Sequence, residues 1–345
     1  MRAGVFLGYW PWISFEEQVS LAVLADELGL DSAWVAEAWG QDAVSVMAVL
    51  ASRTERIAIG SGLMQIPARP PAATAMAAAT LDVISGGRFR LGLGVSGPQV
   101  SEGWYGVPFR RPVTRTREYV EIVRMALARE APLEYAGREY TLPLPDGLGK
   151  PLKLLAKPVQ ERIPVYIGAV GPKAVEQVGE IADGWFPFLV DPDQADILLD
   201  PLRRGLERSG RTLADIDVCA AVPVGLSDDI DEARHAVRPI LTFYLGAMGA
   251  REKNFYVELA ERAGHGEAAN EVQDKFLARD NVGAAMALTD ELIDAMALAC
   301  TPAQLDDRLA RFAAIGVSTF AAFPCGPDRA AIVRALAAAT VGAGV

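Results

Sequence analysis

Strand-like and helix-like runs alternate along almost the whole chain, and this alternation limits the possible folds more than any other feature. A β-branched and aromatic run at 4–9 is followed by a helical run at 15–28 that a glycine ends. Seven further strand-like runs follow, at 32–38, 56–64, 89–95, 164–170, 184–189, 216–224 and 317–323. Such alternation is typical of a parallel sheet with crossover helices. Eight units predict an α/β fold of the closed (β/α)8 barrel type, and a doubly wound open sheet is the alternative.

Three segments do not fit the repeat, and we expect them to be insertions on a single barrel domain that spans 1–345. They lie at about 97–112, 130–160 and 228–300. Alternation about Ala136–Gly137 predicts a hairpin in the second, and the third is mostly helical. In a barrel of this kind the chemistry collects at the C-terminal ends of the strands, so candidate residues are sought there.

Charge and residue usage exclude several classes of function. The net charge of −11 argues against a nucleic-acid or anionic-membrane surface, because phosphate binding needs clustered Lys and Arg. The sequence has no uninterrupted run of 18 apolar residues and no signal-peptide cleavage pattern, so a cytoplasmic location is expected. Cys219, Cys300 and Cys325 are far apart and predict reduced core thiols. His235 and His265 lack ligand spacing, so no metal site is expected.

The stretch "VYIGAVGPKAVEQVGEIADGWF" (165–186) predicts an anion site. A strand ends on Gly168–Gly171, and a helix begins at Pro172 with Gln177 on its polar side. The N–H groups of Gly171, Lys173 and Ala174 are expected to point out of the helix end, where the macrodipole and the Lys173 charge favour a phosphate. Glycines there let the backbone approach a ligand. The alternative is an ordinary βα turn with nothing bound.

A literal GxGxxG, "GLGVSG" at 92–97, is not expected to bind a dinucleotide. The residues after it, "PQVSEGWYGVPF", predict a loop where that motif requires a helix. Gly92 and Gly94 share one face of a strand and are expected to leave room inside the barrel. Gly60 and Gly62 likewise allow an unusual backbone conformation, such as a bulge, at the end of the third strand.

Aromatic residues gather at strand ends and in the loops after them, which favours a flat apolar cavity for a planar ring. The expected substrate pocket consists of Trp10, Trp39, Trp104, Tyr105 and Phe188. Core packing is the alternative for each. Glu37 ends the second strand and is the best-placed acid, although most such carboxylates are only hydrogen-bonded. Arg88 lies at the start of the fourth strand and is expected to be structural.

Four stretches carry a family resemblance. They are "TLDVISGGRFRLGLGVSGPQVSEGWYGVPFRRPVTRTREYVEIVR" (80–124), "GKPLKLL" (149–155), "VYIGAVGPKAVEQVGEIADGWFP" (165–187) and "TPAQLDDRLARFAAIGVSTFAAF" (301–323). Together they resemble the luciferase-like monooxygenase superfamily, and more narrowly its branch of oxidoreductases that use the deazaflavin coenzyme F420.

The resemblance implies a barrel with the deazaflavin across its C-terminal mouth, and a homodimer. By position, Gly62–Leu63 would form a non-proline cis peptide behind the ring. Ser96 and Ser101 would make polar contacts, and Glu37 would be an acid near the ring. Glu37 and Trp39 are the expected catalytic residues. The residues expected to hold the phosphate and side chain of the cofactor are Gly168, Ala169, Val170, Gly171, Pro172 and Lys173.

Departures from the branch narrow the expected activity. Ala38 stands where its sugar-phosphate dehydrogenases carry a catalytic histidine, and Gly97–Pro98 lies near the place of their glutamate. Sugar-phosphate oxidation is therefore not expected. Trp39 suggests a large apolar substrate wall, so we expect hydride transfer between F420 and an apolar organic substrate of the enone, ketone or imine class. The alternatives are an FMN-dependent monooxygenase on the same barrel and a non-catalytic F420-binding carrier protein.

Overall fold

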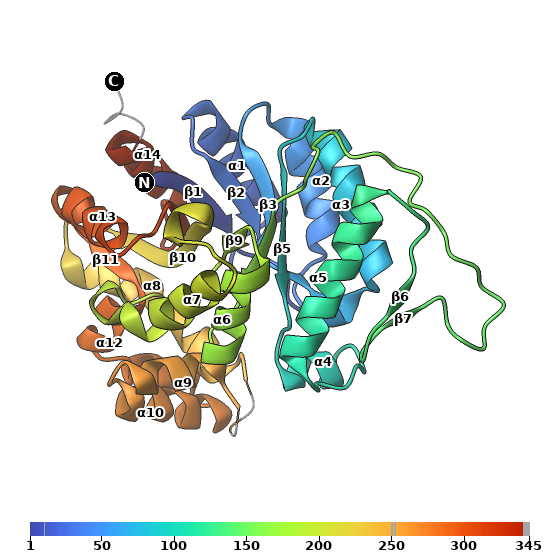
Figure 1. Ribbon diagram of the computed structural model, residues 1–345. Coiled ribbons are helices and arrows are strands. Elements are labelled where there is room, and N and C mark those ends of the chain that lie inside the picture. Colours follow the sequence, from blue (N-terminus) through green and yellow to red (C-terminus); the bar gives the residue numbers. More distant parts are fainter. Residues whose placement is uncertain (10, 250, 252, 341–345) are drawn as a thin grey trace.

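The computed structural model describes residues 1–9, 11–249, 251 and 253–340, which form a closed parallel barrel surrounded by helices (Figure 1). In order around the barrel, its strands are β1 (Arg2–Leu7), β2 (Ser32–Val35), β3 (Ala58–Ser61), β5 (Phe89–Gly94), β8 (Val165–Gly168), β9 (Gly184–Trp185), β10 (Asp217–Leu226) and β12 (Thr319–Pro324). Parallel pairing of β9 with β10 and of β12 with β1 closes the sheet. The predicted (β/α)8 barrel is confirmed, and the open-sheet alternative is wrong.

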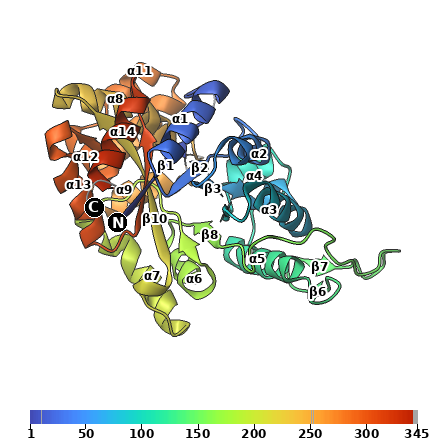
Figure 2. The same ribbon diagram turned by 90° about the horizontal axis from the view of Figure 1, so that it is seen from above.

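Helices follow the strands and cover the barrel from outside, as the view from above shows (Figure 2). They are α1 (Phe15–Glu27), α2 (Ala43–Arg53), α3 (Pro71–Ser85), α5 (Pro112–Ala128), α6 (Pro172–Ile181), α7 (Asp196–Arg208), α8 (Ile230–Gly246) and α14 (Arg329–Thr340). Local sequence sets their ends. The carboxylate of Asp42 accepts the Ser45 N–H at the start of α2, and α3 ends at Gly86 in the left-handed conformation, φ 65°.

Two insertions modify the barrel. Between β10 and β12 lie α9 (Phe255–Arg262), α10 (Gly266–Leu277), α11 (Asn281–Met286), α12 (Asp290–Met296), β11 (Leu298–Cys300) and α13 (Leu305–Ala314). The sequence pattern did not predict β11, which pairs with β10 outside the closed ring. The predicted hairpin is confirmed as antiparallel β6 (Tyr135–Ala136) and β7 (Thr141–Leu142). Beyond β7 the chain projects from the barrel as an arm, residues 143–159 (Figures 1 and 2).

Two local predictions are wrong. The third strand does not run unbroken through 56–64: β3 ends at Ser61, and β4 (Met64–Gln65) then pairs separately with β5. The segment after β5 is not all loop, because α4 (Pro98–Gly103) lies in it. A short helix therefore does follow "GLGVSG". The dinucleotide motif is excluded instead by the closed barrel, since it acts at the switch point of an open sheet.

A polar cluster fills the N-terminal end of the barrel. Arg90 Nη1 lies 2.6 Å from Asp31 Oδ2, and Arg2 Nη2 lies 2.9 Å from Asp217 Oδ2. The Tyr166 hydroxyl donates to the same Asp217 oxygen over 2.7 Å. Burial alone would raise the pKa of Asp31, but the hydrogen bond and charge of Arg90 hold it below its usual value. This end of a (β/α)8 barrel commonly serves stability rather than chemistry.

The structural roles expected for Arg88 and the cysteines are confirmed. The Arg88 guanidinium donates to backbone carbonyls of 51–57 and of Ser85. Cys219, Cys300 and Cys325 are buried and unpaired. Burial raises the pKa of Cys300 to about 11 and that of Cys325 to about 12, so both are neutral thiols near neutral pH.

Candidate active site

A cavity of about 240 Å³ lies at the C-terminal ends of the barrel strands. Its walls come from residues at or just after the C-terminal ends of β1, β2, β3, β4, β5, β8 and β9, and from α4, α5, α6, α8 and α9. Most of the lining is apolar, and the polar side chains in it are Glu37, Gln65, Ser96, Thr116, Gln177, Tyr244 and Tyr256. An apolar cavity with a few placed polar groups is typical of a site for a small organic molecule.

The peptide bond between Gly62 and Leu63 is cis, and the Leu63 side chain occupies space that neighbouring glycines leave free. A Cβ atom would lie 2.1 Å from Leu63 Cδ1 if placed on Gly168, and 3.1 Å from it if placed on Gly94. On Gly92 it would lie 1.9 Å from a backbone oxygen. The room expected inside the barrel is therefore taken by Leu63. Gly168 serves this packing as well as lining the cavity.

Glu37 follows β2 and is held by a bidentate ion pair. Its carboxylate accepts from Arg69 Nη1 over 2.8 Å and from Arg69 Nη2 over 2.7 Å. It also accepts the backbone N–H of Ala43 over 3.2 Å and that of Gln65 over 2.9 Å. Arg69 pairs in addition with Asp42. Because four donors occupy the buried carboxylate, Glu37 is better suited to hold its neighbours in place than to exchange a proton.

Gln65 lies beside Glu37, and sequence reasoning missed it. Its side-chain N–H donates to the Glu37 backbone oxygen over 3.2 Å. Its side-chain oxygen, Oε1, is buried and has no hydrogen-bond donor among the described residues. A buried acceptor without a partner is rare in folded proteins, and this one belongs to a residue that lines the cavity.

The turn from β8 to α6 forms another wall of the cavity. The helix begins at Pro172 as predicted, with Gly171 before it. A Cβ atom on Gly171 would meet nothing within 4 Å, so the turn is open there. The prediction for Ala174 is wrong, because its N–H donates to the Gly171 oxygen over 3.0 Å. The N–H groups of Gly171 and Lys173 have no acceptor among the described residues.

Two further side chains tie this turn to its surroundings. Arg262 of α9 donates to the Val170 oxygen over 3.1 Å and forms no ion pair with any described residue. Lys173 likewise has no ion pair there, and both cations are exposed. Gln177 is buried rather than solvent-facing, and it donates to the Val113 oxygen of α5 over 2.8 Å. Arg262 lies 92 residues along the chain from Val170, so no local pattern could have identified it.

Aromatic side chains from β1, from the segment after β9 and from α8 and α9 form a further wall of the cavity. Phe188 packs against Tyr244 at a centroid distance of 4.5 Å, and Tyr256 packs against Tyr244 at 5.0 Å. Phe6 meets Phe188 at 5.9 Å. All four line the cavity. Burial raises the pKa of Tyr244 well above its usual value, so the wall is uncharged near neutral pH.

The other predicted residues differ in whether they line the cavity. Ser96 lines it, with φ 61°, whereas the buried Ser101 hydroxyl donates to the Val107 oxygen over 2.7 Å and does not. Trp104 is 64% exposed, and Trp39 is 39% exposed and packs on Phe243. Trp39, Trp104, Tyr105, Pro172 and Lys173 are absent from the lining. Trp10 lies outside the described residues.

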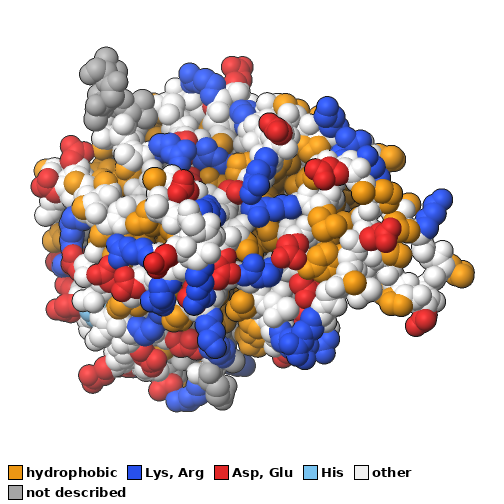
Figure 3. Space-filling view, in the orientation of Figure 1, with side chains coloured by type: hydrophobic (Ala, Val, Ile, Leu, Met, Phe, Trp, Pro, Cys, Tyr) orange, Lys and Arg blue, Asp and Glu red, His pale blue; other side chains and the backbone are white. Residues whose placement is uncertain are grey.

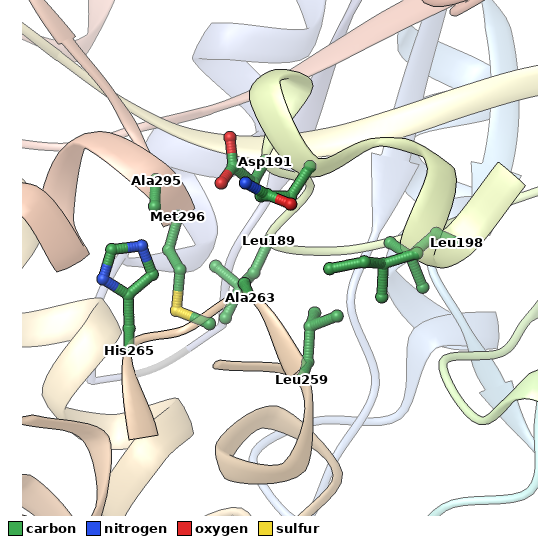
Figure 4. A pocket seen from close by; sticks show the side chains of 10 residues that line it. Leu189, Asp191, Leu198, Leu259, Ala263, His265, Ala295 and Met296 are labelled. Atoms are coloured by element: carbon green, nitrogen blue, oxygen red, sulfur yellow. The ribbon is translucent and has the colours of Figure 1, made fainter. Parts of the chain in front are cut away.

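A second, small cavity between α7, α9 and α12 holds about 10 Å³ (Figure 4). Figure 4 shows Asp191 and His265 at its edge, with Leu259 and Met296 among its apolar walls. This volume barely admits one water molecule, so it is no substrate site. No group of three or more His, Cys, Asp or Glu within the described ranges could hold a metal ion. None of the described helices is long and apolar enough to span a bilayer.

Comparisons with known proteins agree with this geometry. A model of the luciferase-like monooxygenase family matches residues 1–319. The chain is 43% identical over 300 residues to Rv3520c of Mycobacterium tuberculosis, provisionally named a coenzyme F420-dependent oxidoreductase, with 85% of this chain and 86% of that one covered. It is 30% identical over 326 residues to the 5,10-methylenetetrahydromethanopterin reductase of Archaeoglobus fulgidus, covering 92% and 93%. The solved structure of the coenzyme F420-dependent tetrahydromethanopterin reductase from Methanopyrus kandleri superposes with a TM-score of 0.85 at 25% identity, over 99% of each chain.

Proposed function

The chain belongs to the luciferase-like monooxygenase family, and from this membership we propose that it is a coenzyme F420-dependent oxidoreductase. Its reaction would move a hydride between the deazaflavin and an apolar organic substrate of the enone, ketone or imine class. One observation carries the proposal. The cavity at the C-terminal mouth joins a cis Gly62–Leu63 peptide to an open glycine turn at the start of α6.

The lining residues fit a planar ring with an anionic tail. The open position at Gly171 and the free N–H groups of Gly171 and Lys173 suit a phosphate, which helix N-termini favour. Lys173 and Arg262 add unpaired positive charge beside the same turn. The unpartnered Gln65 oxygen suits a ring N–H. When bound, the coenzyme supplies the hydride chemistry, and the protein orients it and excludes water.

The substrate is proposed to lie against the aromatic wall of Phe6, Phe188, Tyr244 and Tyr256. This wall lines the same cavity and carries no charge near neutral pH, so it suits an apolar molecule. Sugar phosphates, which would need cations at this wall, fit it poorly. Trp39, expected from the sequence to be catalytic and to line the substrate pocket, is not part of this proposal, because it packs on Phe243 and does not line the cavity.

Anaerobic titration of the purified protein with oxidised F420 and, separately, with FMN tests the proposed cofactor. We expect saturable quenching of F420 fluorescence at one equivalent per chain and much weaker binding of FMN. Tight binding of FMN with no affinity for F420 would favour the FMN-dependent monooxygenase instead.

The full pairing of Glu37 favours one second candidate, a carrier that binds F420 without turnover, because no other carboxylate lines the cavity among the described residues. Stopped-flow mixing of the reduced-cofactor complex with a panel of enones, ketones and imines separates the two. An enzyme reoxidises the cofactor with at least one compound. A carrier reoxidises it with none.

We also propose a homodimer that uses the outer face of α3 and the arm. Asp82 is the only charged residue of α3, and it is buried, where it accepts the Val159 N–H at the base of the arm over 2.7 Å. The outer face exposes Met76 and Val83, at 59% and 52%. The arm also carries exposed apolar side chains, and Figure 3 shows such side chains on this projecting segment. Uncharged exposed surface of this kind is typical of protein interfaces.

Sedimentation velocity of the wild type and of a Met76→Glu, Val83→Glu double variant tests this interface. A dimeric wild type and a monomeric, folded variant are expected, since two charges would be buried in the contact. A variant that is still dimeric with both substitutions would show that the interface lies on another surface. The cytoplasmic location expected from the sequence stays a prediction.

A further inference from the structure

The amide oxygen of Gln65 is an unused hydrogen-bond acceptor inside the main cavity. Gln65 is 7% exposed and lines the cavity from β4. No described residue donates to its Oε1 atom. A buried acceptor left without a donor destabilises the folded protein, so such an atom is usually satisfied by a ligand or by water.

The orientation of this amide is fixed by its neighbours. The side-chain nitrogen of Gln65 donates to the backbone oxygen of Glu37 over 3.2 Å, and the backbone N–H of Gln65 donates to Glu37 Oε2 over 2.9 Å. Exchanging the amide oxygen and nitrogen would place two oxygens against each other. Arg69 in turn clamps the Glu37 carboxylate with two hydrogen bonds. The acceptor is therefore held by a chain of contacts that begins at Arg69.

The position of Gln65 in the cavity indicates which part of a bound ligand it would contact. Gln65 comes two residues after the cis Gly62–Leu63 peptide and pairs with Gly94 of β5. The open turn before α6 follows β8, the next strand around the barrel from β5, and the aromatic wall comes mainly from elements beyond it. With the anionic tail of the proposed coenzyme bound at the turn before α6 and the substrate at the aromatic wall, the heterocyclic ring of the coenzyme lies beside Gln65.

We propose that Gln65 Oε1 accepts the imide N–H of the deazaflavin ring, and that Glu37 and Arg69 are positioning residues for this contact. The inference rests on the proposed function, because it assumes that the deazaflavin occupies this cavity. The pyrimidine edge of the ring presents one N–H between two carbonyl oxygens, so a single acceptor recognises it. This assignment gives Glu37 a role through Gln65 in place of proton transfer.

The test compares F420 with F420 methylated at the imide nitrogen, which cannot donate this hydrogen bond. Dissociation constants for both are measured by fluorescence titration with wild type, Gln65→Leu and Gln65→Met. The matched control is Gln177→Leu, because Gln177 also lines the cavity but its amide already donates to Val113. Thermal unfolding of each variant verifies that it is folded.

For the wild type and for Gln177→Leu we expect methylation to weaken binding about tenfold, the scale of one neutral hydrogen bond. Gln65→Leu and Gln65→Met are expected to bind both rings equally, at about the weaker affinity. Equal binding of both rings by the wild type would overturn the inference even if the variants failed to fold. F420 binding without discrimination would leave the proposed function standing, whereas no F420 binding by the wild type would defeat both.

Discussion

The two ends of the barrel carry similar polar clusters that differ in one respect. At the N-terminal end, Arg90 pairs with Asp31, and Asp217 accepts from both Arg2 and the Tyr166 hydroxyl. No side-chain N or O atom of that cluster is buried without a partner. At the C-terminal end, Arg69 and Glu37 form an equally close pair, but Gln65 beside them keeps one unused acceptor. Every buried side-chain N and O atom of the first cluster therefore has a partner, whereas the second leaves the Gln65 oxygen without a donor.

This difference shows how a stabilising ion pair can be told from one that serves a site. Charge, burial and pairing are alike at the two ends, so none of them distinguishes function. An unpartnered atom on a residue that lines the main cavity does, because a folded chain seldom buries a polar atom without giving it a partner. The buried Trp12 Nε1 and Arg124 Nε atoms also lack a partner, but these residues do not line that cavity. We therefore expect substitutions at the N-terminal end to change stability, and those at the C-terminal end to change binding as well.

Arg90→Met should have the largest effect. Removing the guanidinium leaves Asp31 with the longer Arg2 contact at 3.3 Å and a hydrogen bond from the Ser32 side chain, and breaking such a buried pair costs about 3 kcal/mol of unfolding free energy. Denaturant unfolding measures this loss. The affinity for F420 should not change, since Arg90 lies at the opposite end from the cavity. A stable variant with weakened F420 binding would show that the N-terminal cluster also affects the cofactor site.

The difference in unfolding free energy between the wild type and Arg90→Met should depend on pH. Arg90 holds the folded-state pKa of Asp31 below its ordinary value, so the stabilisation is complete above the unfolded-state pKa, about 3.9. It is lost as the pH falls from there through the folded-state pKa. The stability difference between wild type and Arg90→Met should therefore be constant from pH 7 to about pH 5 and shrink at lower pH. A difference that grows on acidification would contradict this assignment.

Glu37→Gln should affect both stability and cofactor binding at the C-terminal end. It removes the charge from a carboxylate that four donors hold, so we expect a loss of about 2 kcal/mol in unfolding free energy together with weaker F420 binding. With saturating cofactor, kcat should fall less than tenfold and the pH profile should keep its shape. A loss of 100-fold or more, with one limb of the profile removed, is the behaviour of a general acid and would restore the catalytic role expected from the sequence.

Lys173→Ala and Arg262→Ala should have smaller effects, confined to binding. Each is expected to weaken F420 affinity by about 1 kcal/mol, because both cations are exposed and partly screened. The loss should shrink as salt rises from 0.05 to about 0.5 M, since screening removes exposed charge interactions. An unchanged dissociation constant at low salt would show that the cation does not meet the tail. Lys153→Ala, on the arm, is the matched control.

Trp104→Ala should have the smallest effect. The ring is 64% exposed and lies outside the cavity lining, so stability should change by less than about 0.5 kcal/mol and F420 binding should not change. Differential scanning calorimetry and the fluorescence titration check both. A clear loss of cofactor or substrate binding would place Trp104 in the site after all.

The barrel could be predicted from the sequence because each βα unit repeats the same local pattern. The helix start at Pro172 and the stop at Gly86 follow from residue chemistry within a few positions. The short α4 was missed because its six residues, Pro98–Gly103, contain two glycine or proline positions that favour a loop. The added strand β11 was missed because its pairing with β10 is set by tertiary contact alone.

The site was less predictable, since its key contacts join residues far apart in the chain. Arg69 lies 32 residues from Glu37 in the sequence. Nothing in the sequence therefore indicated that an arginine pairs with the Glu37 carboxylate. Gln65 has no distinguishing neighbours in sequence, and its role rests on which of its atoms is left free. Gly92 and Gly94 suggested empty space, and Gly168 suggested close approach to a ligand, but only the fold shows that the Leu63 side chain lies against all three.

A crystal structure of the complex with oxidised F420 would show where the coenzyme binds and which way its ring faces. The account predicts the deazaflavin against the Gly62–Leu63 peptide, its imide N–H on Gln65 Oε1 and its phosphate at the N–H groups of Gly171 and Lys173. A coenzyme bound outside this cavity, or a ring in it whose imide edge faces the aromatic wall, would contradict it.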